Sequence, residues 1–490
     1  MNNYVQALIH STGIHSNILD MQDTCGHGEG GARAWLEETQ RCIAAMDQTG
    51  ITLNAVLEWN IEADSITCAL DYERSAKGIR GPLHGIPILL KDNIGTGDGM
   101  HTSAGSLALA DRFAVRDAFI AMRLREAGAV LCGKTNMTEL ANFMSDNMAN
   151  GYSSRGGQVR SIWKADADPS GSSTGSAVAV SAGYVSLAIG TETCGSIISP
   201  AAEAGIAGLK PTVGRVSRSG IIPIAPSQDV AGPMARTVAD CALAFSVIAG
   251  YDPEDPITGL SEKRPIPGPE DCVKYIGGLK GLRIGVYALD DGGKPVPYKE
   301  FYEAVRVLEL LGAETVPFSP PPGAAGDMGT LLLHEFRPAM DLALRQGTGA
   351  IRSLEGIAAY NSAHAGKCLR YGQHHIDRAL ALPRPMLTPE YMRSRETARQ
   401  ALRALEQSFC ELSLDAVISL HGLIAFPVTG SPALTFPVGF DEAEIRPVPV
   451  VLNGLPFSEG KLLGIGAALE AAIGKDFRPP LPTVNRFLKY

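Results

Sequence analysis

The chain has 490 residues, of which 45% are hydrophobic and 19% are charged, and its formal net charge is −9 at pH 7. A chain of this length exceeds the size at which one hydrophobic core usually stops growing, so we expect either two lobes or one very large sheet. The acidic balance and the absence of a basic run exclude the electrostatic footprint of a nucleic-acid-binding or anionic-membrane-binding protein. A small-molecule partner is therefore expected.

The nine cysteines are scattered singly, without a CxxC pair. An odd number of isolated cysteines is typical of reduced thiols in a cytoplasm and not of a disulfide framework. The first seventeen residues carry neither a basic region nor an apolar region of a secretory leader, and no segment has the length and composition of a membrane span. These features predict a soluble, cytoplasmic protein.

Strand and helix signals alternate along the first half of the chain. The apolar run 86–90 predicts a buried strand that ends at Lys91. Asp111 is expected to cap a helix that ends at Gly128, and residues 129–132 read as the next buried strand. Thr237 then opens a helix through a capping-box-like spacing.

The same rhythm continues in the second half. Phe301, Val305 and Leu308 share one face of a predicted helix, Thr388 and Pro389 open another, and the segment DAVISL, residues 415–420, follows as a strand. Helices alternating with short apolar strands predict an α/β fold.

Two familiar motifs occur in contexts that argue against them. Residues 128–135 fit the phosphate-loop pattern GxxxxGK[ST], but a helix is expected before Gly128 and a strand inside the supposed loop. Residues 171–175 fit the GxSxG nucleophile elbow, with five downstream histidines available for a triad, but an Asp-Pro turn precedes them where an elbow needs a strand. No histidine or cysteine spacing indicates a metal site.

Lys91 is the notable side chain that remains, and two interpretations of it stay open. A lysine at the end of a strand can simply pair with its neighbour Asp92. Alternatively, the buried strand carries the ammonium into a dry interior, where desolvation lowers its pKa and leaves a neutral amine able to act as a base.

Five segments together resemble the amidase signature family, and residues 208–242 look most like the bacterial peptide amidases within it. The segments are GPLHGIPILLKDNI (81–94), GKTNMTELANF (133–143), SSRGGQ (153–158), DPSGSSTGSAVAVSAG (168–183) and TETCGSIISPAA (191–202). The resemblance implies one domain over 1–490 built on a large mixed, twisted sheet covered by helices on both faces. Its core would span about 70–250 and 410–490, with a more variable, mainly helical region at about 251–409.

The resemblance also implies a Ser-Ser-Lys triad. Ser196 matches the nucleophile, Ser172 the bridging serine that follows a cis peptide bond from Gly171, and Lys91 the base. A hydroxyl both donates and accepts a proton, so Ser172 can relay the proton of Ser196 to a neutral lysine and later return one to the leaving amine.

Further site roles follow from the same resemblance. An oxyanion hole would come from the backbone N–H groups of Thr193, Cys194, Gly195 and Ser196. Ser173 is expected to hydrogen-bond within the turn that holds Ser172, and residues between Asn142 and Met144 are expected to line the substrate.

Two departures from the family pattern bear on specificity. Ile198 stands where many relatives carry arginine. It cannot form an ion pair with Glu192, so the carboxylate of Glu192 must have another partner. The connection 421–430 is short where the family has a longer one along the leaving-group side, which predicts a more open pocket.

The function expected is hydrolysis of a peptide amide, aryl amide or alkyl amide through an acyl-enzyme, with no metal or organic cofactor, in a monomer or homodimer. The alternatives are hydrolysis of a carbamate (urethane) or ester at the same site, and the role of an amidotransferase A-type subunit that works with partner chains. A nucleotide-binding protein that uses residues 128–135 is the remaining alternative.

Overall fold

The computed structural model describes residues 17–26 and 30–474. The expectation drawn from the start of the chain concerns residues 1–17, of which residues 1–16 lie outside the described residues. None of the helices within the described ranges is both long enough and apolar enough to cross a membrane.

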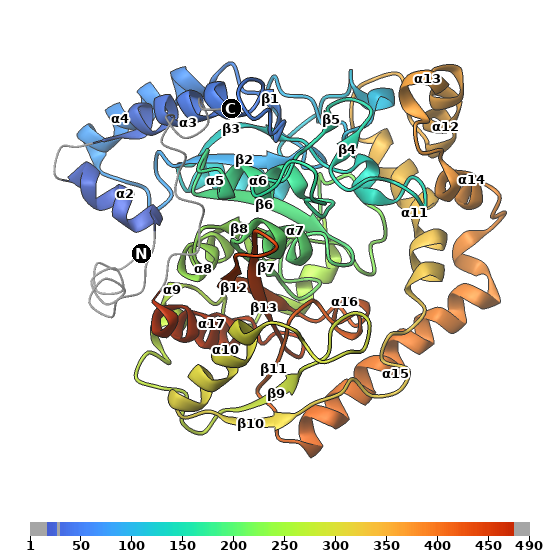
Figure 1. Ribbon diagram of the computed structural model, residues 1–490. Helices are drawn as coiled ribbons and strands as arrows, with labels where there is room; N and C mark the ends of the chain where they lie inside the picture. Colours follow the sequence, from blue (N-terminus) through green and yellow to red (C-terminus); the bar gives the residue numbers. More distant parts are fainter. Residues whose placement is uncertain (1–16, 27–29, 475–490) are drawn as a thin grey trace.

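A mixed sheet of 11 strands runs through the centre of the molecule (Figure 1). Its order is β1-β3-β2-β6-β8-β7-β12-β13-β11-β9-β10. Strands β2, β3 and β6 are parallel to one another, as are β9, β10 and β11, while the central pairs are antiparallel. The strands are β1 Val56–Trp59, β2 Pro87–Lys91, β3 Val130–Thr135, β6 Leu187–Glu192, β7 Ala207–Lys210, β8 Val230–Ala235, β9 Arg283–Tyr287, β10 Glu314–Pro317, β11 Ala416–Ser419, β12 Ala433–Asp441 and β13 Arg446–Asn453, with β4 Tyr152–Ser153 and β5 Gly157–Gln158 as a separate pair.

Helices cover both faces of the sheet, and α11 to α15 form a further group of helices beside it (Figure 1). The α-helices are α2 Asn17–Gly26, α3 Ala32–Met46, α4 Ala63–Lys77, α5 Phe119–Glu126, α6 Thr174–Ser181, α7 Ile198–Ala204, α8 Val238–Ile248, α9 Pro269–Val273, α10 Lys299–Leu310, α11 Met328–Arg345, α12 Leu354–Ala363, α13 Ala365–Cys368, α14 His374–Leu380, α15 Pro389–Glu411, α16 Ala425–Val428 and α17 Glu459–Ile473. The short 3₁₀ helices are η1 Leu107–Leu109, η2 Glu139–Asn142, η3 Pro256–Ser261 and η4 Pro385–Leu387. This arrangement confirms the predicted fold class.

The alternation of side chains along β2 decides which face receives its last residue. Ile88 and Leu90 pack in the apolar cluster that includes α5, α8 and α17, whereas Leu89 packs in the cluster that includes α3, α6 and α7. Because side chains two residues apart lie on the same face of a strand, Lys91 lies on the face of Leu89. The lysine therefore faces the side of the sheet that α6 and α7 cover.

Close packing brings α6 against the sheet. The whole of α6 is buried, and a Cβ atom added at Gly175 would lie 2.3 Å from the carbonyl oxygen of Asn136 and 2.4 Å from that of Ala55. Only glycine permits this approach. The N-terminus of α6 is thus held where the carboxyl end of β2 arrives.

Most predicted helix starts are confirmed. The hydroxyl of Thr237 accepts a hydrogen bond from the backbone N–H of Asp240 at the start of α8, and the hydroxyl of Thr388 caps α15 in the same way. The start expected at Asp111 is wrong, since the helix begins at Phe119. The segment between Asp111 and Phe119 forms isolated β-bridges with other loops, including one between Ala114 and Gly347. Its backbone groups therefore bond to these loops and not within a helix.

The region 251–409 contributes strands as well as helices. β9 and β10 lie at one edge of the sheet, where β9 pairs in parallel with β11. Apolar residues of this region join the same cluster as the core strands, among them Ile284 and Phe301.

Candidate active site

Three chain segments meet at the carboxyl ends of β2 and β6. Lys91 is the last residue of β2 and Glu192 the last residue of β6, and these neighbouring strands are parallel. Ser172 lies just before α6, and Ser196 just before α7. In α/β sheets, ligands bind outside the carboxyl ends of strands, and the three side chains predicted to be catalytic, Lys91, Ser172 and Ser196, belong to segments that gather at such an edge.

The Lys91 amine lies among hydroxyl groups. It is fully buried, and its Nζ lies 2.8 Å from Ser172 Oγ and 2.9 Å from Ser173 Oγ. A third contact, 3.1 Å long, joins Nζ to the carbonyl oxygen of Thr191. All three groups are neutral.

The electrostatic surroundings of Lys91 favour its uncharged form. Burial lowers the pKa of Lys91 to about 7, although the carboxylates of Glu192 and Asp229 act in the opposite direction. Desolvation disfavours an ammonium more strongly than these two charges favour it. Above neutral pH the amine is therefore mostly neutral and able to accept a proton.

The alternative interpretation of Lys91, an ion pair with Asp92, is wrong. The Asp92 carboxylate instead accepts hydrogen bonds from the Ser103 hydroxyl and, at 2.9 Å, from the backbone N–H of Gly105. Its nearest cation is Arg155, with 3.5 Å between Nη1 and Oδ1. Lys91, the last residue of β2, and Asp92, which follows it, thus belong to separate hydrogen-bond networks.

The loop before α6 is shaped by close contacts. The peptide bond between Gly171 and Ser172 is cis, and a Cβ atom at residue 171 would lie 2.5 Å from Thr138 Oγ1. The Ser172 carbonyl accepts a hydrogen bond from the Thr138 N–H at 3.1 Å. Ser173 Oγ donates to the Thr191 carbonyl at 3.0 Å, so the turn is tied to the end of β6.

Ser196 is the more accessible of the two predicted catalytic serines. It is 8% exposed, whereas Ser172 is 0% exposed. The Ser196 carbonyl accepts a hydrogen bond of 3.2 Å from the backbone N–H of Ser173, which joins the two serine segments. No hydrogen bond links the hydroxyls of Ser172 and Ser196 in the described part of the chain.

The turn before α7 presents a row of backbone N–H groups. Among the described residues, none of the N–H groups of Thr193, Cys194, Gly195 and Ser196 donates a hydrogen bond within the chain. Gly195 has φ of +83°, which glycine adopts without strain. Converging N–H groups of this kind can stabilise an oxyanion.

The carboxylate of Glu192 is bound by backbone N–H groups, in place of the arginine that many relatives carry at position 198. Its Oε2 accepts hydrogen bonds from the backbone N–H groups of Ile197 at 2.7 Å and Ile198 at 3.0 Å. These N–H groups belong to the N-terminal end of α7, which a carboxylate stabilises. The carboxylate thereby orients the turn that carries Ser196.

Asp229 is a site residue that sequence reasoning missed. Its Oδ1 accepts a hydrogen bond of 2.6 Å from the Thr193 hydroxyl, and its Oδ2 accepts from the N–H groups of Ile224 and Ala225, each at 2.9 Å. Burial raises the pKa of Asp229 to about 6. A carboxylate directly before the fully buried strand β8 is the signal that could have found it, by the reasoning applied to Lys91.

A small cavity of about 20 Å³ lies beside the end of β6 and the start of β8. Asn93, Ala141, Thr193 and Asp229 are among its lining residues. Asn93 donates to Thr191 Oγ1 at 3.0 Å, and its own Oδ1 is buried without a hydrogen-bond partner among the described residues. The lining thus includes Thr191, whose carbonyl contacts Lys91, and Thr193, whose hydroxyl contacts Asp229.

Asn142 and Met144 were predicted to line the substrate, but neither is among the residues that line the small cavity, whereas their neighbour Ala141 is. Asn142 is exposed, with φ of +69°, and Met144 is buried in an apolar cluster with Phe143 and Phe336. Met144 is therefore packed inside the protein and is not among the residues that line the small cavity.

The competing motifs do not form the sites that their patterns suggest. Residues 130–135 form β3, so a strand occupies the supposed phosphate loop, and Lys134 Nζ donates to the Ile94 carbonyl at 2.5 Å. At the supposed elbow, the hydroxyls of Ser172 and Ser173 contact Lys91 and not a histidine. Within the described ranges, no three His, Cys, Asp or Glu side chains gather as a metal site would require.

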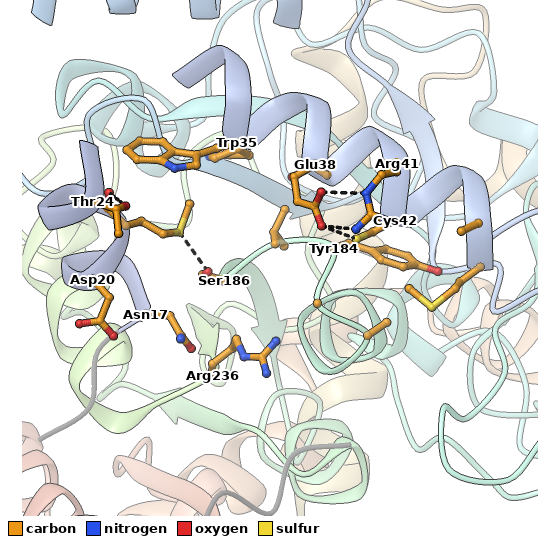
Figure 2. Close-up of a pocket in the computed structure, with 18 of the residues that line it drawn as sticks. Asn17, Asp20, Thr24, Trp35, Glu38, Arg41, Cys42, Tyr184, Ser186 and Arg236 are labelled. Carbon is orange, nitrogen blue, oxygen red and sulfur yellow. Dashed lines mark hydrogen bonds and ion pairs between the residues drawn. The ribbon is translucent and has the colours of Figure 1, made fainter. Parts of the chain in front are cut away.

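A cavity of about 540 Å³ lies at the opposite end of the same strands (Figure 2). Its wall includes Pro87 at the start of β2 and Ser186 just before β6, together with Trp35 and Cys42 of α3. Burial raises the pKa of the Cys42 thiol to about 11. The cavity is thus separated from Lys91 by the length of β2, about 15 Å.

Comparison with known proteins gives a consistent answer. The family model described as Amidase matches residues 37–420. A probable amidase of Arabidopsis thaliana is 35% identical over 446 residues, which cover 88% of this chain and 85% of the relative. The A-type subunit of a glutamyl-tRNA(Gln) amidotransferase from Chloroflexus aurantiacus is also 35% identical, over 89% of this chain and 92% of its own length.

Solved structures agree with these relatives. The native peptide amidase of Stenotrophomonas maltophilia superposes with a TM-score of 0.88 at 39% identity, covering 96% of this chain and 99% of that chain.

Proposed function

Because the chain belongs to the amidase signature family, we propose that it hydrolyses the C–N bond of an amide through an acyl-enzyme formed on Ser196. One observation carries the proposal: Lys91 Nζ lies 2.8 Å from Ser172 Oγ in a site where burial lowers the pKa of the lysine to about 7. A base poised near the working pH is what general-base catalysis requires.

The proposed reaction moves one proton along two hydroxyls. Ser196 Oγ attacks the amide carbonyl as its proton passes to Ser172, whose own proton passes to Lys91. The tetrahedral oxyanion accepts hydrogen bonds from the N–H groups of residues 193–196. Ser172 then delivers a proton to the leaving nitrogen as the C–N bond breaks, and water hydrolyses the ester on Ser196 by the reverse route.

The proposed relay requires a hydrogen bond between the hydroxyls of Ser172 and Ser196, and we propose that it forms when substrate binds. Catalytic hydrogen bonds often tighten only when substrate is bound. The backbone link from Ser173 to Ser196 keeps the two hydroxyls in neighbouring segments.

Substrates of the proposed enzyme are peptide amides, aryl amides or alkyl amides, and the similarity to a peptide amidase supports the first of these. A carbamate or ester presents the same carbonyl to the same donors, and it is the alternative to test beside them. The proposed enzyme needs no metal or organic cofactor, because its base, relay and oxyanion donors are all groups of the protein.

The similarity to the A-type subunit of an amidotransferase favours a second candidate function, in which the chain works with partner chains. The rate at which the isolated chain hydrolyses simple amides is measured alone and after the other subunits of such an amidotransferase are added. Hydrolysis by the isolated chain at a rate that these subunits do not raise would exclude the second function. Failure to act without such partners would favour it.

The test of the proposed function is a substrate screen combined with mass spectrometry. Amides, anilides, carbamates and esters with one chromogenic leaving group are offered to the wild-type chain, to Ser196→Ala and to the control Ser199→Ala. We expect turnover and an acyl adduct on Ser196 in the wild type and in the control. Turnover by Ser196→Ala above about one part in 10³ of the wild-type rate would contradict the nucleophile assignment, since losing a serine nucleophile typically costs far more.

A further inference from the structure

The cavity of about 540 Å³ at the starts of β2 and β6 has a mainly apolar wall (Figure 2). Trp35 and Met46 of α3 and Met21 of α2 belong to this wall. Two charged side chains of α3 also line the cavity but bind each other, since Arg41 Nε donates to Glu38 Oε2 at 2.8 Å. Removing apolar surface of this kind from water is favourable, so the wall favours an apolar occupant.

The chain leaves α17 next to this cavity. Glu470, in the last turn of α17, accepts hydrogen bonds from the backbone N–H of Val238, which lies 3.2 Å from Oε2 and 3.4 Å from Oε1. Arg236, two residues before Val238, lines the cavity. The helix ends before Gly474, whose φ is +61°. Residues 475–490 therefore begin close to the cavity.

The distance to be covered is short. One helical turn, about 6 Å, separates Glu470 from the end of α17. Two residues, about 7 Å along the backbone, separate Val238 from Arg236. The four residues that follow α17 span about 13 Å when extended, which matches these two distances together. The run that starts at Pro479 can therefore reach the cavity wall at Arg236.

The sequence of residues 475–490, which lie outside the described residues, is KDFRPPLPTVNRFLKY. Pro479, Pro480 and Pro482 surround Leu481, so residues 479–482 have the PxxP spacing. Because proline fixes φ, such a run loses little conformational entropy on binding, and proline-rich segments typically dock in grooves lined by aromatic side chains. The wall that contains Trp35 is suited to such a segment.

The charges of the cavity and of this segment are complementary. Arg236 and Asp20 both line the cavity, Arg236 on the side of α17 and Asp20 on α2. The segment carries Asp476 before the prolines and Arg486 after them. Residues 1–16, which adjoin the cavity at the start of α2, contain no proline and no Asp, Glu, Lys or Arg. Composition therefore favours the segment after α17 as the occupant.

We propose that residues 475–490 of this chain pack in the cavity of Figure 2, with residues 479–482 against Trp35. The segment then joins α17 to α3 and covers the starts of β2 and β6, at the opposite end of these strands from Lys91. The proposal is independent of the proposed function, because it involves none of the catalytic groups.

Cross-linking in the full-length chain tests the placement. The photoreactive residue p-benzoylphenylalanine replaces Leu481, and adducts are mapped by mass spectrometry after illumination. Benzophenone reacts readily with methionine, so we expect adducts on Met21 or Met46, which line the cavity. The same residue in place of Leu310, which is exposed on α10 and does not line the cavity, is the control and should give neither adduct. Absence of adducts on cavity residues from position 481 would overturn the proposal.

Two variations of this experiment test other occupants. A mixture of ¹⁵N-labelled and unlabelled chains separates cross-links within one chain from those between chains, and we expect the former. Cross-links only between chains would assign the cavity to a second copy and overturn the proposal. With p-benzoylphenylalanine in place of Ile9, we expect no adduct on Met21 or Met46. Such an adduct from position 9, with none from position 481, would assign the cavity to residues 1–16.

Thermal unfolding tests the contact energetically. Leu481→Asp places a charge against an apolar wall and should lower Tm by about 3 °C, whereas Leu387→Asp, at an exposed position outside the cavity, should leave Tm unchanged. Ala45→Trp fills the cavity from α3. In that background the site is already occupied, so Leu481→Asp should lower Tm by less than about 1 °C. Equal losses in both backgrounds would overturn the proposal.

Discussion

Two buried lysines lie on adjacent strands of this protein, and they differ in what surrounds them. Lys91 ends β2 and Lys134 lies in β3, where it pairs in register with Leu90. Both are fully buried, and burial lowers the pKa of Lys91 to about 7 and that of Lys134 to about 8. Burial alone therefore does not distinguish them.

Their hydrogen-bond partners do. The amine of Lys91 contacts the hydroxyls of Ser172 and Ser173, groups that can give up a proton. The amine of Lys134 contacts the Ile94 carbonyl and the Thr102 hydroxyl, and the carboxylate of Asp92 favours its charged form. A base needs both a depressed pKa and a proton donor that leads to substrate, and Lys91 alone of this pair lies beside the serine segment that reaches Ser196.

Exchanging each lysine for methionine separates the two roles, and the largest effect is expected here. Lys91→Met should lower kcat/KM by about 10³-fold or more, because general-base catalysis is lost while the fold keeps an apolar side chain of similar length. Lys91→Arg should not restore activity, since a guanidinium stays protonated. Lys134→Met is the comparison, with kcat/KM expected within about tenfold of wild type. A larger loss in Lys134→Met than in Lys91→Met would reverse the assignment.

The pH profile sharpens the same contrast. Since the amine acts only when neutral, kcat/KM should rise about tenfold per pH unit below 7 and level off above the pKa of about 7. Lys134→Met should keep this midpoint. A flat profile between pH 5 and 9 would be incompatible with a lysine base.

Removing a charge near Lys91 should produce a smaller, directional change. The Asp229 carboxylate raises the pKa of Lys91, so Asp229→Asn should move the midpoint of the pH profile to lower pH. An amide at residue 229 has one oxygen where the carboxylate has two, so it cannot accept both from the Thr193 hydroxyl and from the N–H groups of Ile224 and Ala225, and kcat should also fall about tenfold with little change in KM. Thr193→Val, which removes the donor but keeps the carboxylate, should lower kcat without moving the midpoint. A midpoint that moves equally in both variants would contradict the electrostatic explanation.

The smallest expected effect concerns stability. Because the pKa of Lys91 is lowered on folding, the unfolded chain binds more protons between about pH 7 and 10.5, and wild-type stability rises with pH across that window. Lys91→Met removes this dependence, so its Tm should exceed that of wild type by a few degrees at pH 6 and approach it near pH 10. Thermal unfolding at both pH values measures the difference, and a larger gain at pH 10 would have the wrong sign.

Local signals explain why much of the fold and site was predictable from sequence. The apolar run before Lys91 and the capping residues Thr237 and Thr388 depend on neighbours within a few residues, and the structure confirms these elements. Family resemblance added the pairing of Lys91 with Ser172, which are 81 residues apart.

Long-range contacts account for what was missed. Asp229 reaches Thr193 only because β8 returns antiparallel to β6, a pairing that no local pattern reveals. The helix expected from Asp111 starts later because bridges to distant loops occupy the intervening backbone.

Direct titration of the Lys91 amine is the decisive measurement. In protein labelled with ¹³C at the lysine Cε, the Lys91 resonance is assigned by its absence from Lys91→Met and followed from pH 5 to 11. We expect a midpoint near 7, matching the midpoint of kcat/KM. A midpoint above 10 would show an ordinary ammonium at residue 91 and would contradict a lysine base in this site.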